Sequence, residues 1–213
     1  MKNDFVFLKM ELRRIFVFCV FLMAVSIRSV DVSAEGLANV WGGFQFSGQH
    51  SVTVGAASAT TTVNSGFSFG GDFDVLVADM AEIGIGYQWQ FSRSQTLYLG
   101  NFNFSDWYLS IRLPISFDQI TIYPVGRVGY GLFFGDVSYT GDGSLNGGLY
   151  YAVGAGLRSH DFTDPFVKWA RDYFFIEGTY DRNSGSDYNW YYDFTANVIY
   201  SAFNLNIGLG SRF

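Results

Sequence analysis

The sequence predicts an all-β protein, namely a transmembrane antiparallel up-and-down β-barrel of eight strands. Apolar and polar residues alternate with a period of two in several separate runs, as in strands with lipid on one side and a lumen on the other. The connections between these runs alternate between short and long, like periplasmic turns and extracellular loops. No acidic or basic residue interrupts the centre of the apolar face, where Arg or Lys would cost roughly 2–4 kcal/mol in lipid.

The alternation is clearest at the C-terminus. One face is apolar apart from Ser211 and comprises Phe203, Leu205, Ile207, Leu209 and Phe213. The other face is polar or small and comprises Asn204, Asn206, Gly208, Gly210 and Arg212. No amphipathic helix has this period. The same pattern predicts strands over 38–47, 67–77, 83–92, 107–115, 120–132, 149–158 and 174–181, the first of which is the weakest, with Gln45 and Ser47 expected to face inward.

The connections complete the expected topology. Short turns are predicted at 78–81 and 117–119, and loops rich in Gly, Ser, Thr, Asn and Asp at 48–65, 93–103, 135–147 and 182–201. Between the sixth and seventh strands, Asp164 and Pro165 are typical of a helix start, which predicts a short periplasmic helix near 164–171. Residues 190–198 also alternate. We interpret them as an extension of the last hairpin beyond the membrane, with ten strands as the alternative.

Residue types on the polar face favour a membrane barrel over a soluble, lipocalin-like one. Glycine is frequent there, which suits a narrow and crowded interior better than a solvated surface. The few charges on this face are of both signs and predict an ionic cluster that plugs the lumen, because buried charges are tolerated when paired. The expected members of this lumen cluster are Asp72, Asp74, Arg112, Arg127, Arg158, Glu177 and Arg212.

The N-terminus predicts export. Four basic residues precede an apolar run over 15–25 that is too short to span a bilayer, and Val32-Ser33-Ala34 fits a cleavage site. We therefore expect a signal peptide over 1–34 and an outer-membrane β-barrel domain over 35–213. The mature chain would carry eight basic and 16 acidic residues, a net charge of −8 that argues against nucleic acid as a partner. Its only cysteine, Cys19, would be removed, so no thiolate metal site is expected.

The mature sequence resembles the small bacterial outer-membrane barrels of the opacity-protein and OmpA-like membrane-domain kind. The resemblance is carried by the segments 122–131 (IYPVGRVGYG), 154–158 (GAGLR) and 205–213 (LNIGLGSRF). It implies a location in the cell outer membrane of a Gram-negative organism, in contact with outer-membrane lipid and lipopolysaccharide. It also implies that Phe213 is the assembly signal read by the barrel assembly machinery. No peptidoglycan-binding domain follows the barrel, so no tethering role of that kind is expected.

Three functions follow from this fold. The leading hypothesis is a structural or surface-interaction protein whose extracellular loops contact a host or cell-surface ligand. The alternative is a narrow channel or small-solute porin, although an eight-stranded barrel is normally filled by its own side chains. A lipid-modifying enzyme is the least favoured, because only His50 and His160 are available. His50, beside Ser51, has no orienting acid, and His160, next to Asp161, is expected in a periplasmic turn away from lipid A. We therefore expect no enzyme activity, no cofactor and no catalytic, cofactor-binding or metal site.

Overall fold

The computed structural model describes residues 35–78, 80–94, 101–118, 120–135, 146–159, 162–163, 171–189 and 194–213. This part of the chain is all-β and contains no helix, so no helix in it could span a membrane. Its strands are β1 (Gly36–Gln45), β2 (Gly48–Val54), β3 (Ala57–Val63), β4 (Gly66–Val77), β5 (Ala81–Ser94), β6 (Asn101–Arg112), β7 (Ile115–Ser116), β8 (Ile120–Gly135), β9 (Gly148–Ser159), β10 (Phe162–Thr163), β11 (Arg171–Asn189) and β12 (Phe194–Arg212).

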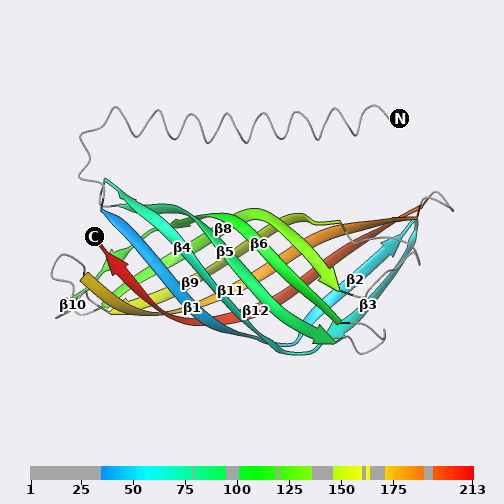
Figure 1. Cartoon of the computed structure of the whole chain (residues 1–213), viewed down its shortest axis with the longest axis horizontal. Coiled ribbons are helices and arrows are strands. Elements are labelled where there is room, and N and C mark those ends of the chain that lie inside the picture. The colour runs from blue at the N-terminus through cyan, green and yellow to red at the C-terminus, as the bar shows by residue number, and fades with distance from the viewer. Residues whose placement is uncertain are drawn as a thin grey trace. The chain divides into compact units, whose positions relative to one another are not determined.

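These segments form eight barrel strands, because four strands each consist of two segments separated by a short break. β1 and then β2 pair with β12. On their other side, β1 pairs with β4 and β2 pairs with β3. β7 continues β6 along β8, and β10 continues β9 along β11. Every pairing is antiparallel, and β12 pairs with both β11 and β1, which closes the barrel (Figure 1). The eight-stranded prediction is confirmed and the ten-stranded alternative is wrong.

The register of the strands sets their tilt. A path of paired residues leaves β11 at Arg182 and crosses Tyr151, Val128, Leu109, Ile85, Phe73, Ala38 and Ser211. It returns to β11 at Asp172, ten residues from where it began. Such a stagger gives strands tilted by roughly 35–45° in a barrel whose interior is just wide enough for side chains. The lumen is therefore a packed core.

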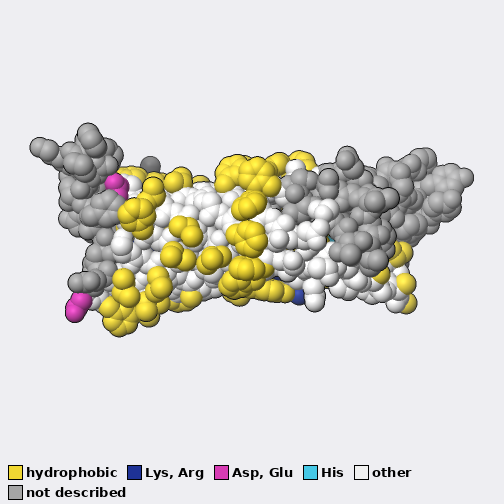
Figure 2. All heavy atoms as spheres, turned by 90° about the horizontal axis from the view of Figure 1, so that it is seen from below, with side chains coloured by type: hydrophobic (Ala, Val, Ile, Leu, Met, Phe, Trp, Pro, Cys, Tyr) yellow, Lys and Arg dark blue, Asp and Glu magenta, His cyan; other side chains and the backbone are white. Residues whose placement is uncertain are grey.

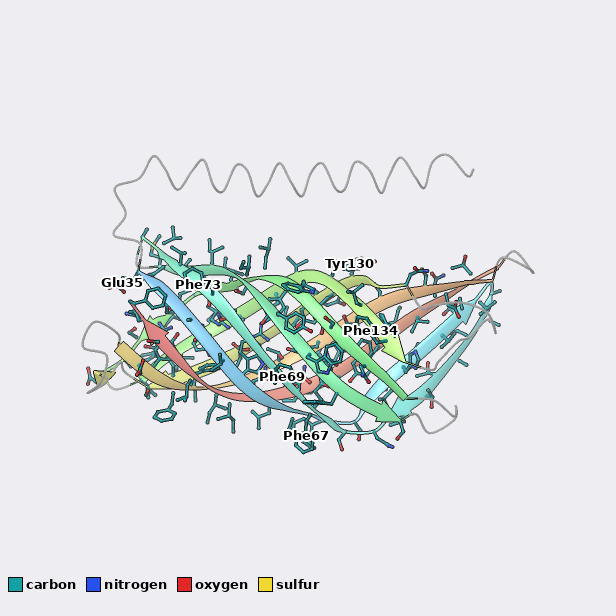
Figure 3. The ribbon with its side chains drawn as sticks, in the orientation of Figure 1. Glu35, Phe67, Phe69, Phe73, Tyr130 and Phe134 are labelled. Atoms are coloured by element: carbon teal, nitrogen blue, oxygen red, sulfur yellow. The ribbon has the colours of Figure 1, made fainter. Side chains whose placement is uncertain are left out.

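The two faces of the strands differ as the alternation predicts. Outward side chains are apolar and exposed, for example Ile85 at 64%, Trp107 at 61% and Ile207 at 58%. Inward neighbours such as Asp74 and Glu177 are 0% exposed. Figure 2 shows hydrophobic side chains gathered over the middle and one end of the barrel, with few charged groups among them. Phe67, Phe69 and Phe73 follow one another along β4, and Phe73 lies near Glu35 (Figure 3). Because water is absent from hydrocarbon, this closed sheet with an apolar exterior suits a bilayer.

The two ends of the barrel differ in their connections. At the turn end, Val77 joins Ala81 and Ser116 joins Ile120 through the predicted short turns; Met80 donates to Val77 O at 3.1 Å and Phe117 to Ile120 O at 2.8 Å. At the hairpin end, β2–β3 and β11–β12 project furthest and lie side by side (Figure 1). Short turns are typical of the periplasmic side, which makes the hairpin end the extracellular one.

Two loop predictions are corrected by the structure. Residues 48–65 mostly form β2 and β3, and residues 182–201 belong largely to β11 and β12. The polar composition of both stretches indicates loops, but β2 pairs with β12 along Gln49–Val54, which satisfies its backbone groups. The interpretation of the last hairpin as extended is confirmed, since β11 and β12 stay paired up to Asn189 and Phe194.

A β-bulge separates β1 from β2. Between the pairs Gln45–Asn204 and Gln49–Ser201, β1 and β2 have three residues where β12 has two. The extra residue reverses the alternation, so that Ser47 is exposed while Gly48 is buried. The prediction that Gln45 faces inward is therefore confirmed, and the one that Ser47 faces inward is wrong.

Several predictions lie outside the described residues. These are the signal peptide over 1–34, most of the loop at 135–147, the central part of the loop at 93–103 and residues 164–170 of the predicted helix. Arg171, the last residue of that predicted helix, is the first residue of β11.

Candidate functional site

The central ionic cluster crosses the lumen between strands that are not neighbours. Arg112 on β6 contacts two carboxylates of β4, with Nη2 at 2.6 Å from Asp72 Oδ2 and Nη1 at 2.5 Å from Asp74 Oδ2. Its Nε lies 3.4 Å from Oε2 of Glu177 on β11, which also pairs with Arg127 of β8. All five side chains are at most 3% exposed. The cluster therefore joins four strands through the interior.

Neutral groups complete the hydrogen bonding of these carboxylates. Asn39 Nδ2 donates to Asp72 Oδ1 at 2.7 Å and to Asp74 Oδ2 at 3.1 Å. Ser110 donates to Asp74 Oδ1 at 2.6 Å, and Tyr173 donates to Asn39 Oδ1 at 2.6 Å. A buried ion pair offsets its desolvation only when further hydrogen bonds satisfy the remaining polar atoms. Here much of that requirement is met on the acidic side.

The arginines also pack against aromatic rings. The guanidinium carbon of Arg127 lies 5.1 Å from the ring centroid of Trp41 and 5.0 Å from that of Tyr108. Arg158 lies 5.2 Å from the ring of Tyr173. Such cation–π contacts are strongest when desolvated, which is the case in this interior.

The remaining two predicted members lie apart from the central cluster. Arg158 pairs with Glu82 at 2.6 Å, both buried. Arg212 lies at the turn-end rim, 3.5 Å from Glu35, where the two side chains are 19% and 42% exposed. The sequence analysis did not include Glu82 in the lumen cluster. Glu82 lies two residues before the inward Gly84, so extending the predicted strand by one residue would have placed it on the inward face.

Inward glycines make room for the aromatic side chains of the lumen. A Cβ on Gly86 would lie 2.5 Å from Cζ of Tyr108, and one on Gly208 would lie 2.5 Å from Cζ of Phe175. Real Cβ atoms do not approach so closely. The rings thus lie against backbone that has no side chain, which explains why glycine is frequent on the polar face.

Polar groups continue above the cluster toward the hairpin end. Gln90 Nε2 donates to Asp106 Oδ2 at 2.8 Å, and Asp181 Oδ2 accepts from Gln88 Nε2 at 3.3 Å and from Tyr150 at 3.2 Å. Toward the same end, an aromatic cluster also fills the lumen. Phe104 stacks on Tyr200 with centroids 4.8 Å apart and meets Phe133 edge-on at 4.5 Å, and Val63, Val198 and Ala202 complete this aromatic cap.

The space left inside is small. The gap near the turn end that is lined by Asn39, Glu82, Arg112, Tyr123, Arg158, Tyr173 and Phe175 has no room even for a water molecule. It therefore cannot hold a small-molecule ligand. Among the described residues, no group of three His, Cys, Asp or Glu side chains is arranged to hold a metal ion.

The structure also separates the residues considered for catalysis. His50 and Ser51 are neighbours on β2, so their side chains point to opposite faces. His50 is 2% exposed, whereas Ser51 is on the outside and hydrogen bonds Thr60 at 2.8 Å. They cannot act as a nucleophile and its base. His160 lies outside the described residues.

Comparison with known proteins identifies the fold. No family model and no curated protein matches the sequence. Among solved structures, the outer membrane protein OprG from Pseudomonas aeruginosa matches with a TM-score of 0.56 and 14% identity, over 84% of this chain and 96% of OprG. Neisserial surface protein A matches with a TM-score of 0.45 and 14% identity, over 83% and 97%. Ail, the attachment invasion locus protein of Yersinia pestis, matches with a TM-score of 0.41 and 15% identity, over 85% and 100%.

At this level of identity the likeness shows the fold. Together with the closed sheet and its apolar exterior, it places the barrel in the cell outer membrane. The chain is a small eight-stranded outer-membrane β-barrel that resembles OprG.

Proposed function

We propose that the protein is a non-enzymatic scaffold that presents a binding surface at its hairpin end, where it contacts another cell or a host surface. The observation that carries this proposal is the change of polarity along β12. From Leu209 to Phe203 the outward residues are apolar, whereas further along they are Ser201, the partly exposed Ile199, and the exposed Asn197 and Thr195, with Tyr200, Val198 and Ala196 buried inside. Beyond the apolar band the barrel therefore continues with a core and a mostly polar exterior, as a soluble sheet does.

The exterior of this extension is unusual in composition. Cross-strand pairs of hydroxyl residues cover β2 and β3, with Ser51 hydrogen bonded to Thr60 at 2.8 Å and Thr53 to Ser58 at 3.2 Å. Ser184 and Ser186 of β11 continue the surface beyond β12. A rigid, paired sheet loses little conformational entropy on binding, which favours recognition. These features support a surface that offers neutral hydrogen-bonding groups to its partner.

The test measures adherence of bacteria that lack their own adhesins and express this chain. One variant replaces Gln49–Thr62 by Asn-Gly, because Gly48 pairs with Val63 and a two-residue turn can join them. A second variant, Ser51→Glu with Thr60→Lys, keeps β2 and β3 and changes only an outward pair. We expect the unmodified protein to raise adherence to epithelial cells or aggregation of the bacteria, and both variants to abolish the gain.

Gel mobility with and without boiling verifies that each variant is folded, since closed barrels resist unfolding in detergent. The matched control is Met80→Ser in the turn between β4 and β5, at the opposite end of the barrel. Loss of adherence in folded hairpin variants but not in the control supports the proposal. Adherence that persists in both folded hairpin variants would contradict it.

The contacts inside the lumen argue against the channel alternative. The central ionic cluster and the aromatic cap both lie across the lumen, where a water path would have to pass. We expect no steady conductance in planar bilayers, and none after Arg212→Gln at the rim. Discrete openings in the unmodified protein that change after Arg127→Ala would instead support conduction.

A further inference from the structure

One arginine on the outside of the barrel has no carboxylate partner. Among the basic side chains that the structure describes, Arg112, Arg127, Arg158 and Arg212 each form an ion pair. Arg182 forms none, and it is partly exposed between the inward residues Asp181 and Asn183 of β11. An unpaired arginine is available to an anion from outside the chain.

Arg182 lies at the upper boundary of the apolar band. Its outward neighbours toward the turn end are Phe174, Ile176 and Tyr180, whereas Ser184 and Ser186 follow toward the hairpin end. Arg182 lies ten residues along β11 from Asp172. In a tilted strand this separation is roughly 25 Å along the barrel axis, which is about the height of the apolar band of such barrels. Arg182 is thus at the level of the lipid headgroups of the outer leaflet.

Hydrogen-bonding groups lie beside Arg182 in the same cross-strand row. Arg182 pairs with Ser201 of β12, which pairs with Gln49 of β2. On its other side Arg182 pairs with Tyr151 of β9. These side chains, which we call the Arg182 row, can donate to phosphate or sugar oxygens beside the guanidinium. On the described outer face of β2, β3, β11 and β12 toward the hairpin end, no acidic side chain opposes an anion.

An aromatic patch lies directly below the Arg182 row. Phe203 pairs with Tyr180 and lies 5.7 Å from Phe46, whose ring is 5.2 Å from that of Phe44. Phe67 of β4 extends the patch, with its ring 5.6 Å from that of Phe44 (Figure 3). These four rings are 36–64% exposed on the outside of the barrel, in the part of the bilayer that holds acyl chains.

We propose that the Arg182 row and the aromatic patch together bind a phosphorylated glycolipid of the outer leaflet, of the lipid A class. The guanidinium pairs with a phosphate, Ser201 and Gln49 hydrogen bond the sugar, and acyl chains pack on Phe203 and Phe46. The charge and the uncharged donors lie side by side above the apolar patch, as the phosphates and sugars of such a lipid lie above its acyl chains. This inference does not depend on the proposed adhesive function.

The test uses protein extracted from the outer membrane in mild detergent and counts retained lipid by native mass spectrometry. The probes are lipid A with both phosphates, the same lipid without phosphates, and phosphatidylcholine. The variants are Arg182→Gln and Arg182→Lys, with Arg212→Gln as a control that removes the same charge at the opposite rim. Gel mobility with and without boiling verifies that each variant is folded.

We expect Arg182→Gln to lower retention of phosphorylated lipid A about fivefold, the factor contributed by one basic side chain near an anionic membrane surface. Arg182→Lys should keep part of the binding, and Arg212→Gln should keep all of it. Dephosphorylated lipid A should bind the unmodified protein and Arg182→Gln equally. The proposal is overturned if Arg182→Gln retains phosphorylated lipid A like the unmodified protein, or if Arg212→Gln loses it to the same extent.

Discussion

The ring of Tyr108 on β6 lies against the backbone of Gly86, its partner on β5, where a Cβ would be only 2.5 Å from Cζ. This contact has consequences across the lumen, because the guanidinium of Arg127 also packs on the Tyr108 ring, 5.0 Å from the ring centroid. Arg127 in turn pairs with Glu177, which also contacts Arg112. The absence of a side chain at Gly86 thus makes room for the Tyr108 ring, on which Arg127 packs while it pairs with Glu177.

Gly86→Ala tests this arrangement. The added methyl group would displace the Tyr108 ring that packs on Arg127, and overpacking of this kind typically costs about 1–3 kcal/mol in the free energy of unfolding. Gly42→Ala is the matched control, since a Cβ there meets no atom within 4 Å. Urea unfolding in lipid vesicles, followed by tryptophan fluorescence, should show a lower midpoint for Gly86→Ala only. Equal midpoints would mean that the ring can shift without cost.

The central ionic cluster should respond to mutation differently from the rim pair. Arg112→Met leaves Asp72 and Asp74 buried without their cation, and removing one partner of a buried pair costs about 3–5 kcal/mol. Arg212→Met breaks a partly exposed contact with Glu35, for which less than about 1 kcal/mol is expected. Adding Asp72→Asn and Asp74→Asn to Arg112→Met should recover part of the loss.

The measurement is again the unfolding midpoint in urea, supported by the temperature at which the folded band disappears from gels. If Arg112→Met and Arg212→Met lower the midpoint equally, the cluster is not a stabilising element of the lumen. If the two asparagine substitutions lower the unfolding midpoint of Arg112→Met further, the loss of stability in Arg112→Met does not arise from unpaired carboxylates.

Particular residues show what the sequence could and could not predict. Leu205, Asn206 and Ile207 alternate between lipid and lumen because successive side chains of a strand without a bulge point to opposite faces, so their faces follow from sequence alone. The pairing of Arg112 with Glu177 depends on the stagger of strands around the whole barrel, which no local pattern contains. Residues 57–63 (ASATTTV) have the composition of a loop, and β3 exists because β2 provides its partner.

The bulge between β1 and β2 gives a prediction about residue count. Deleting Ser47 leaves two residues opposite the two of β12, so that β1 and β2 become one regular strand along β12 in which Gln45 and His50 still face inward. Deleting both Phe46 and Ser47 leaves one residue opposite two, so that either His50 turns outward or the pairing of β2 with β12 slips. We expect the hairpin of β2 and β3 to become sensitive to protease in intact vesicles in the double deletion, with cleavage sites located by mass spectrometry, whereas the single deletion should stay protected. The double-deletion variant remaining as resistant as the single deletion would show that the residue count does not set the orientation of the hairpin.

Phe213 provides the last prediction, which concerns assembly. Its backbone N–H donates to Gly36 O at 3.0 Å, Gly36 N–H donates back to Phe213 O at 2.9 Å, and its ring lies 5.9 Å from that of Phe73. The residue therefore has a structural contact as well as the assembly role that the resemblance implies, and a test must separate the two.

We expect Phe213→Ser to lower the amount of folded barrel in the outer membrane of cells, while the purified variant refolds in detergent with at most a modest loss of stability. Phe174→Ser, which removes another exposed ring near the same end, should lower neither quantity to a comparable extent. If Phe213→Ser fails to refold in detergent as well, the ring serves barrel closure itself; if it assembles normally in cells, Phe213 is not the residue that the assembly machinery reads.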